Sequence, residues 1–457
     1  MRIKLSDHFT YKRLLRFALP SMVMMVFTSI YGIVDGLFVS NFVGKTPFAA
    51  INLIMPILMI IGAFGFMMGA GGTAIVSKTL GENDSVLANR YFSMFVYITA
   101  GVGAVMAVLG VMFLRPLSVL LGAEGDMLDC CVSYGRIVII AMPAFMLQNL
   151  FQSFFIVGEK PKLGLLVTVL AGVTNMVLDA LFVAVFKMGL EGAAIATSIS
   201  QAVGGIVPLI YFLSKNTSLI SLVHTRLYPK ALFKAITNGS SELMSNISSS
   251  VVTILYNYQL MKFAGENGVA AYGVIMYVSF TFIAIFIGYS VSSAPIIGFH
   301  FGAKNKGELK NLLRCSTVIT LVIGAAMAAI GFIFATPLSK IFVSYDKELL
   351  DMTARGLRIF SLSFFLSGFS IFGSSFFTAL NNGLASALIS FLRTLVYQML
   401  GVLLLPLIFK LDGIWYSMFV AEVLAFTTTV IFIFALKNKY GYMGKTTAEA
   451  SDIDTSV

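Results

Sequence analysis

Long apolar stretches recur along nearly the whole chain, and they constrain its fold more than any other feature. Twelve such stretches are separated only by short polar segments. A helix needs about 20 apolar residues to cross the hydrocarbon core of a bilayer, which is about 30 Å thick. The sequence therefore predicts an all-α polytopic membrane protein with twelve transmembrane helices. The predicted spans are 17–39, 48–72, 91–114, 135–157, 162–186, 189–213, 233–260, 269–299, 313–334, 358–379, 384–409 and 412–436.

The composition excludes most classes of soluble protein. Of the 457 residues, 58% are hydrophobic and only 11% are charged, whereas a soluble protein has about 25% charged residues. No polar segment is long enough to form a separate catalytic domain. The three histidines and three cysteines fit no zinc, disulfide or nucleophilic motif, and no phosphate-binding loop is present. We therefore expect no enzyme activity, no ATP, no nucleic-acid partner and no cofactor.

The basic residues predict the orientation of the chain, because Lys and Arg concentrate in cytoplasmic loops. If both termini are cytoplasmic, twenty of the 31 Lys and Arg residues lie on that side and ten on the other, with Arg393 inside a span. The first apolar stretch is too long for a cleavable signal peptide. We expect a multi-pass membrane protein with both termini in the cytoplasm.

The chain also contains an internal repeat, because similar residues recur at an offset of 221 positions. A single gap-free offset that holds along the chain indicates duplication. Each half has six predicted spans, so the two halves enter the membrane from the same side and form parallel repeats. The pairs include Gly44 with Gly265, Ala49-Ala50 with Ala270-Ala271, Ile54-Met55 with Ile275-Met276, Gly81 with Gly302, and Pro116-Leu117-Ser118 with Pro337-Leu338-Ser339.

This repeat predicts two pseudo-symmetric six-helix lobes. The N-terminal lobe covers 1–213 and the C-terminal lobe covers 233–440. A cytoplasmic linker at 214–232 joins them, and 441–457 form a flexible cytoplasmic tail. Two homologous lobes around a central cleft are typical of an alternating-access carrier, whereas a channel more often repeats as separate subunits around a pore.

Charged side chains inside a membrane are costly, so each one is a candidate functional residue. Five lie within the predicted spans: Asp35, Asp179, Glu242, Arg393 and Glu422. Arg393 and Glu422 are expected to pair as a structural ion pair between neighbouring helices.

Asp35 and Asp179 are predicted to lie at the same depth. Each is about 17–18 residues into a span that runs outward from the cytoplasm, or roughly 26 Å at 1.5 Å per residue. Asn175 lies one helical turn before Asp179, on the same face. Two carboxylates and an amide can bind a proton or a hard cation such as Na⁺. The alternative is a hydrogen-bonded pair that only holds the two helices together.

A substrate cleft is predicted from Glu242, Tyr256, Gln148 and Met59. Glu242 lies in a serine-rich span that is too polar to face lipid on all sides. Tyr256 is the repeat equivalent of Asp35, so the two lobes differ chemically. Methionines are flexible and can form an adaptable pocket for mixed apolar cargo. For Glu242 the alternative is a buried carboxyl group among serines.

Six segments resemble the MATE (multidrug and toxic compound extrusion) family, in particular its MepA-like bacterial branch. Together with the twelve spans and two halves, the resemblance covers almost the whole chain. The segments are GIVDGLFVSNFVG (32–44), AAINLIMPI (49–57), GGTAIVSKTLGE (71–82), TNMVLDALFV (174–183), MGLEGAAIATSISQ (188–201) and GFHFGAKNKGEL (298–309).

The resemblance implies the MATE fold and an exporter that exchanges cationic amphiphilic drugs and dyes for inward H⁺ or Na⁺. It also implies that the cation site comprises Asp35, Asn175, Asp179 and Thr197, and that Glu242 matches an acid used in some branches. Some relatives have a further acid in the tenth span, whereas 358–379 contains none. Coupling through Asp35 and Asp179 is therefore favoured over a second ion site.

We therefore predict a secondary multidrug antiporter, a monomer in the lipid bilayer. A flippase for lipid-linked oligosaccharides shares the two-lobe plan, but it needs a cationic cavity for phosphate, and most charges in these spans are acidic. A lipid-modifying membrane enzyme needs a catalytic cluster near one interface, and none is evident in the sequence.

Overall fold

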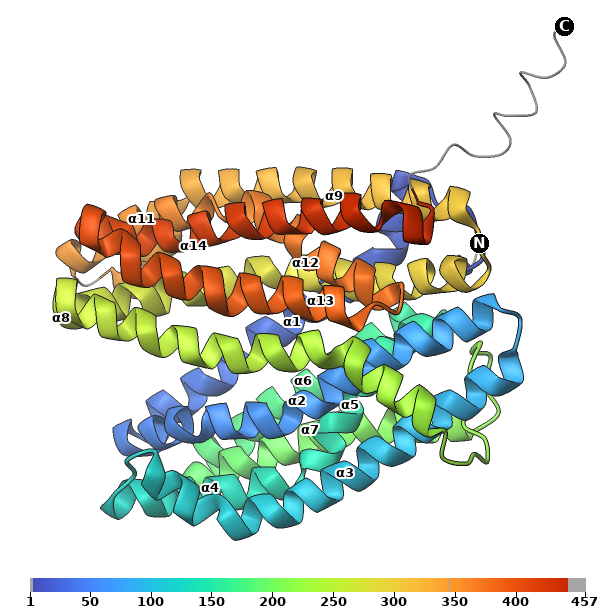
Figure 1. Cartoon of the computed structure of the whole chain (residues 1–457). Coiled ribbons are helices and arrows are strands. Elements are labelled where there is room, and N and C mark those ends of the chain that lie inside the picture. The colour runs from blue at the N-terminus through green and yellow to red at the C-terminus, as the bar shows by residue number, and fades with distance from the viewer. Residues whose placement is uncertain (1–2, 345, 443–457) are drawn as a thin grey trace, which may run out of the picture. The chain divides into compact units, whose positions relative to one another are not determined.

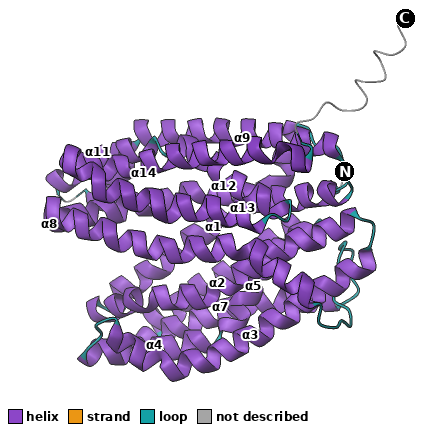
Figure 2. Cartoon of the chain, viewed as in Figure 1, coloured by secondary structure: helices purple, strands orange, loops and turns teal. Residues whose placement is uncertain are grey.

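The computed structural model describes residues 3–344 and 346–442, and in this part of the chain the regular structure is entirely helical (Figures 1 and 2). The helices are α1 (Tyr11–Phe42), α2 (Lys45–Gly81), α3 (Ser85–Leu120), α4 (Gly125–Ile140), α5 (Met142–Val157), α6 (Pro161–Asp179), the π-helical turn η1 (Ala180–Val185), α7 (Gly189–Leu213), α8 (Pro229–Gly302), α9 (Lys306–Ile333), α10 (Ala335–Val343), α11 (Lys347–Ser361), α12 (Phe364–Ala379), α13 (Gly383–Phe391), the π-helical turn η2 (Leu392–Val396) and α14 (Tyr397–Tyr440).

The helices account for the twelve predicted spans. Eight helical segments among the described residues are long and apolar enough to cross a membrane, and two bent pairs, α4 with α5 and α11 with α12, raise this number to ten. Two of the eight segments, Pro229–Gly302 and Gly383–Tyr440, have 74 and 58 residues. Each is long enough for two crossings and contains a non-helical residue, Gly265 or Lys410. Division there gives twelve spans, which confirms the predicted fold class.

The boundaries differ from the prediction at the two bent pairs. α4 begins at Gly125, ten residues before the predicted start, and it meets α5 at an angle of 53°. α11 likewise begins at Lys347, before the predicted start at 358, and it meets α12 at 49°. The first half of each pair carries charged residues, such as Asp126 and Glu348. A hydropathy pattern therefore does not include these halves in an apolar span.

The backbone carries the same 221-residue repeat as the sequence. Positive φ angles recur at this offset in three pairs. Gly44 (φ 115°) matches Gly265 (φ 59°), and Gly189 (φ 63°) matches Lys410 (φ 51°). Asn83 and Lys304 form the third pair, with φ of 65° and 55°. Because a positive φ strains any residue except glycine, its retention at Lys410 indicates that the turn between two spans requires it.

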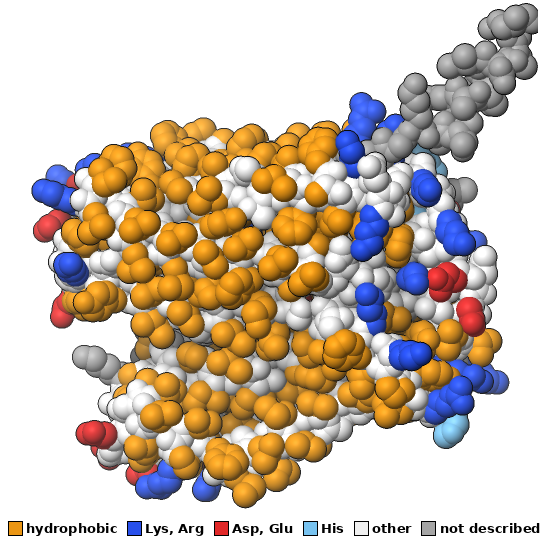
Figure 3. Space-filling view, viewed as in Figure 1, with side chains coloured by type: hydrophobic (Ala, Val, Ile, Leu, Met, Phe, Trp, Pro, Cys, Tyr) orange, Lys and Arg blue, Asp and Glu red, His pale blue; other side chains and the backbone are white. Residues whose placement is uncertain are grey.

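Contacts divide the chain into two compact units. The C-terminal unit comprises the described residues of Met1–Ala18, Ser77–Asp84 and Ser248–Val457, and the N-terminal unit comprises Leu19–Val76 and Ser85–Ile247. In the N-terminal unit α7 packs on α4, α5 and α6, and in the C-terminal unit α12 packs on α9, α13 and α14 (Figure 1). On the face shown in Figure 3, hydrophobic side chains cover the middle of each unit and most charged side chains lie toward its two ends.

The units differ from the predicted lobes in three segments. The start of α1 and the end of α2 belong to the C-terminal unit, and the start of α8 belongs to the N-terminal unit. The end of α2 crosses the end of α8 at Gly81 and Gly302, which are equivalent in the repeat. A Cβ at Gly81 would lie 2.0 Å from the carbonyl oxygen of Phe299, and one at Gly302 would lie 2.0 Å from that of Lys78. This backbone contact therefore requires glycine on both helices.

We predict that Gly81→Ala and Gly302→Ala each destabilise this crossing. Because the added methyl group would overlap a carbonyl oxygen, the cost should be about 1–3 kcal/mol, as for other overpacked sites. The measurement is the apparent Tm of the purified protein in detergent. Gly101→Ala in α3 is the matched control, since nothing lies within 4 Å of the Cβ position there. An equal Tm for all three variants would contradict the predicted contact.

Candidate functional site

Asp35 and Asp179 come together inside the N-terminal unit. Asp35 lies in α1, Asp179 is the last residue of α6, and their carboxyl groups are close enough to interact directly. Asp179 is fully buried, and neither of its carboxylate oxygens has a hydrogen-bond partner within the described residues. Oδ1 of Asp35 is also buried without a partner. The two carboxyl groups therefore form a pair with three buried oxygens that have no hydrogen-bond partner among the described residues.

Two neutral oxygens predicted for the same site are also buried. Asn175 is 2% exposed and lies one helical turn before Asp179, and its Oδ1 has no partner among the described residues. The Oγ1 of Thr197, on α7, is likewise buried and unpaired. Thr197 lies near Tyr134, which in turn lies near both Asp35 and Asp179. The structure thus gathers all four predicted residues around one place.

Two tyrosines in this cluster were missed by the sequence analysis. Tyr31 lies one turn before Asp35 on α1 and interacts with its carboxylate. Its spacing of four residues from Asp35 was a signal that could have identified it. Tyr134 comes from α4 and is 2% exposed. Nothing in its local sequence points to a site, because its place depends on how α4 packs against α7.

The helix geometry changes immediately after Asp179. The backbone passes from α6 into the π-helical turn η1, in which the N–H of Phe186 bonds to the carbonyl of Leu181 at 2.8 Å. π-Helical turns inside α-helices are frequent at functional sites, because the extra residue re-aims the side chains beside it. The turn therefore lies where a small change in backbone geometry would move Asp179 relative to Asp35.

This cluster offers oxygen ligands only: two carboxylates, one amide and one hydroxyl. Burial of a charge in apolar surroundings is costly unless a counter-charge or hydrogen bonds compensate for it. A proton or a hard cation would provide this compensation, and oxygen donors suit hard cations. No group of three or more His, Cys, Asp or Glu side chains within the described part of the chain could hold a transition metal.

The four predicted cleft residues lie on three helices. Met59, on α2, and Glu242, on α8, are exposed in the N-terminal unit. Gln148, on α5, is 5% exposed in the same unit. Tyr256, on α8 but in the C-terminal unit, is 1% exposed and stacks on Tyr272 with ring centroids 4.9 Å apart.

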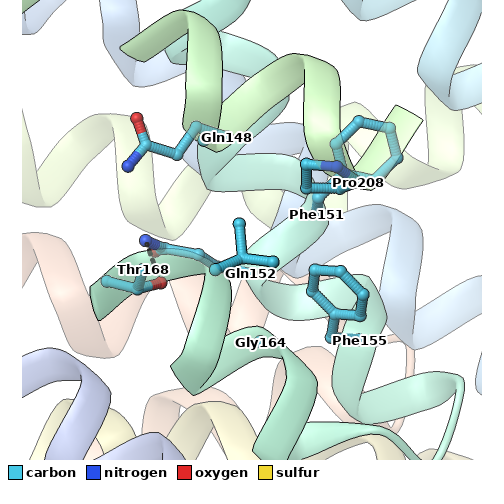
Figure 4. Close-up of a pocket in the computed structure, with 9 residues that line it drawn as sticks. Gln148, Phe151, Gln152, Phe155, Gly164, Thr168 and Pro208 are labelled. Carbon is cyan, nitrogen blue, oxygen red and sulfur yellow. Dashed lines mark hydrogen bonds between the residues drawn. The ribbon is translucent and has the colours of Figure 1, made fainter. Parts of the chain in front are cut away.

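Gln148 lines a small pocket between α5, α6 and α7 (Figure 4). In this pocket Gln152 donates a hydrogen bond to Thr168 at 3.4 Å. Gly204 allows α7 to approach Gln148 closely, since a Cβ there would lie 2.5 Å from the amide carbon of Gln148. The other lining residues are Phe151, Phe155, Gly164, Val167 and Pro208.

The ion pair predicted in the C-terminal half is confirmed. Nε and Nη2 of Arg393, in η2, donate to Oε1 of Glu422, in α14, at 2.9 and 2.8 Å. The side chains are 13% and 1% exposed. The buried carboxylate of Glu422 therefore has a cation from its own chain, whereas the carboxylates of Asp35 and Asp179 form no ion pair among the described residues.

Comparisons with known proteins agree with this architecture. The multidrug export protein MepA of Staphylococcus haemolyticus (strain JCSC1435) is 25% identical over 435 residues, covering 94% of each chain. The protein of the same name from Staphylococcus aureus (strain NCTC 8325 / PS 47) is 23% identical over 450 residues, again covering 94% of each.

Solved structures show the same fold. A crystal structure of a MATE protein in complex with MaL6 matches with a TM-score of 0.89 at 22% identity, covering 95% of this chain and 98% of that one. An outward-facing multidrug resistance MATE family transporter of the MOP superfamily matches with a TM-score of 0.88, at the same identity and coverage.

The family model described as MatE matches residues 20–181 and again 243–403. The two matches lie in the two halves of the sequence repeat, and together they cover more than half of the chain. The match confirms the family that the sequence motifs predicted, and because this is a family of transporters, it agrees with the prediction that the chain is not an enzyme. The chain is a multi-pass membrane protein that belongs to the MATE family of transporters.

Proposed function

We propose that this protein is a secondary multidrug antiporter, which exports cationic amphiphilic drugs and dyes in exchange for inward H⁺ or Na⁺. The observation that carries the proposal is the pair of Asp35 and Asp179, with buried oxygens that no group among the described residues satisfies. The similarity to MepA multidrug export proteins over 94% of the chain supports the substrate class.

The coupling cation would bind at Asp35, Asn175, Asp179 and Thr197. One proton on either carboxyl group would relieve the repulsion between the two acids. A dehydrated Na⁺ would do the same and would be coordinated by the amide and hydroxyl oxygens as well. The oxygen set suits either ion, so the imposed gradient that drives transport is the deciding measurement.

Exchange follows if the cation and the drug stabilise different conformations. A ligand shifts a conformational equilibrium only by the difference in its affinity for the two states. Cation binding at Asp35 and Asp179 would repack α1 against α6 and displace the drug from the cleft on the outer side. Loss of the cation on the inner side would then favour rebinding of drug, with Glu242, Tyr256, Gln148 and Met59 as the proposed cleft residues.

The remaining features of the proposal follow from the sequence. The distribution of Lys and Arg supports cytoplasmic termini in a bacterial cytoplasmic membrane. We further propose two lobes, 1–213 and 233–440, joined by the linker at 214–232 and followed by the tail at 441–457. The transporter would function as a monomer in the bilayer, without ATP and without a nucleic-acid partner.

Ethidium efflux from proteoliposomes tests the function. We expect efflux when an inward H⁺ or Na⁺ gradient is imposed, and none when both gradients are absent, because only the cation gradient drives the exchange. Testing each gradient separately identifies the ion. If neither gradient drives export of any cationic dye, the antiporter proposal fails, and transport of lipid-linked oligosaccharide becomes the function to examine.

A further inference from the structure

The segment 219–228, immediately before α8, is fixed on the first turns of α3. The backbone N–H of Ser221 donates to Oδ1 of Asn89 at 3.0 Å. Two residues on, the N–H of Val223 donates to Oγ of Ser93 at 2.8 Å. These bonds hold the segment 219–228 along α3, within the N-terminal unit. The positions of the side chains that follow in this segment are therefore set by α3.

Two arginines converge beside this docked segment. The guanidinium carbon of Arg226 lies 5.2 Å from the ring centroid of Tyr228. The backbone carbonyl of Arg90 accepts a hydrogen bond from the hydroxyl of Thr225 at 2.8 Å, and both guanidinium groups lie near the Tyr228 hydroxyl. The ring of Tyr91 packs on Tyr228 edge to face, with centroids 5.2 Å apart. Desolvation tends to raise the pKa of Tyr228, but the two guanidinium groups outweigh it and lower that pKa below its usual range. The site thus places two guanidinium groups beside one tyrosine hydroxyl.

The equivalent segment in the other half of the repeat carries carboxylates that pair with some of its basic residues. Residues 5–9 precede α1 as 219–228 precede α8, and they dock on the first turns of α9. There, Glu308 accepts from the N–H of Phe9 at 2.9 Å and contacts His8 at 2.6 Å, and Asp7 pairs with Arg13. Carboxylates therefore accompany the basic residues at this position.

The arginine site has no such carboxylate. Neither Arg90 nor Arg226 forms an ion pair with any described residue. Lys230 and Lys234 follow on the first turns of α8, and both are exposed. Since the same architecture carries its own anions in the C-terminal unit, the unmatched charge in the N-terminal unit points to an anion that comes from outside the chain.

The neighbouring side chains indicate a lipid as the source of that anion. Leu227, which directly follows Arg226, is 61% exposed, and Phe233, in the second turn of α8, is 69% exposed. Tyr228 and Tyr91 are of the type enriched at the boundary between headgroups and acyl chains. An arginine fork matches the geometry of a phosphate, and apolar side chains at the same place suit acyl chains. A soluble anion would not explain the exposed apolar residues.

We infer that Arg90, Arg226 and Tyr228 bind the phosphate of an anionic phospholipid headgroup at the inner surface of the membrane. Basic residues close to an anionic membrane surface are attracted to it, so both arginines favour such binding. The acyl chains would lie against Leu227 and Phe233. The site is distinct from the proposed cation site, and it does not depend on the direction or the cargo of transport.

Native mass spectrometry of the full chain, released from mixed micelles, tests this site. The probes are phosphatidylglycerol and, for comparison, zwitterionic phosphatidylcholine. We expect the wild type to retain phosphatidylglycerol preferentially and Arg90→Gln/Arg226→Gln to lose this preference. Lys437→Gln/Lys439→Gln is the matched control, because these exposed lysines each contact a separate aromatic ring and do not converge. The control should bind like the wild type.

Three results would overturn the inference. One is an unchanged preference for phosphatidylglycerol in the folded arginine variant, as judged by size-exclusion chromatography. The second is an equal loss in the lysine control, which would indicate general charge attraction. The third is displacement of the lipid by inorganic phosphate, which would indicate a soluble anion. If the double variant does not fold, Tyr228→Phe replaces it, since it keeps both charges and should weaken retention. Because the readout is binding, a failure of antiport leaves this test unaffected.

Discussion

Replacing Asp179 with asparagine is expected to abolish gradient-driven dye export while leaving the protein folded in the membrane. Asparagine has nearly the same size and polarity, so the packing of the fully buried side chain is preserved. It cannot, however, carry the negative charge that a proton or Na⁺ neutralises. Efflux from proteoliposomes should therefore fall to the level of protein-free liposomes, because cation binding no longer shifts the conformational equilibrium.

The control for this prediction is Asp126→Asn. Asp126 is an exposed acid in the first turn of α4, so its replacement removes the same charge without touching the buried cluster. Export should remain at the wild-type level. Asp35→Asn should behave like Asp179→Asn, since the proposed site needs both carboxylates. Wild-type efflux from a folded Asp179→Asn variant would contradict the assignment of the coupling site.

The helices could be predicted from the sequence because each membrane span is a long apolar run between short polar segments, so hydropathy alone identifies it. The 221-residue offset also predicted features of the backbone that hydropathy does not show. Gly44 and Gly265 were paired by sequence alone, and both adopt positive φ. Ala50 and Ile54 pair with Ala271 and Ile275, and each pair is fully buried in the core of its own half. Duplication preserves turns and core packing even where the surface residues have diverged.

What the sequence did not predict depends on tertiary contacts. The end of α2 belongs to the same compact unit as most of α8, α9 and the C-terminal helices. Hydropathy gives no signal of this grouping. Tyr134 joins the carboxylate cluster from α4, more than forty residues from either aspartate in sequence. By contrast, Asp35, Asn175 and Asp179 were identifiable, because polar groups are rare in membrane spans and therefore conspicuous.

The buried acid of the C-terminal half has a basic partner, Arg393, whereas the two acids of the N-terminal half have none among the described residues. Replacement of Arg393 should therefore also have a large effect. Glu422 is 1% exposed, and its Oε2 has no partner among the described residues. The two bonds from Arg393 to Oε1 therefore supply most of the compensation for its charge. Asp35 and Asp179 have no such internal cation, and this contrast is why we place the exchangeable cation in the N-terminal half.

We predict that Arg393→Met destabilises the protein by about 3–5 kcal/mol, the usual cost of leaving one partner of a buried ion pair uncompensated. The measurement is the loss of apparent Tm in detergent. The double variant Arg393→Met/Glu422→Met is the decisive control, because removal of both charges leaves no uncompensated group and similar side-chain volume. It should recover most of the lost stability. If the double variant is as unstable as the single one, the loss of packing explains the effect. In that case the charge of Glu422 would not need compensation by the guanidinium group of Arg393. Recovery, together with retained dye export, would instead show that the charge pair serves stability while the unpaired acids of the other half carry the exchange.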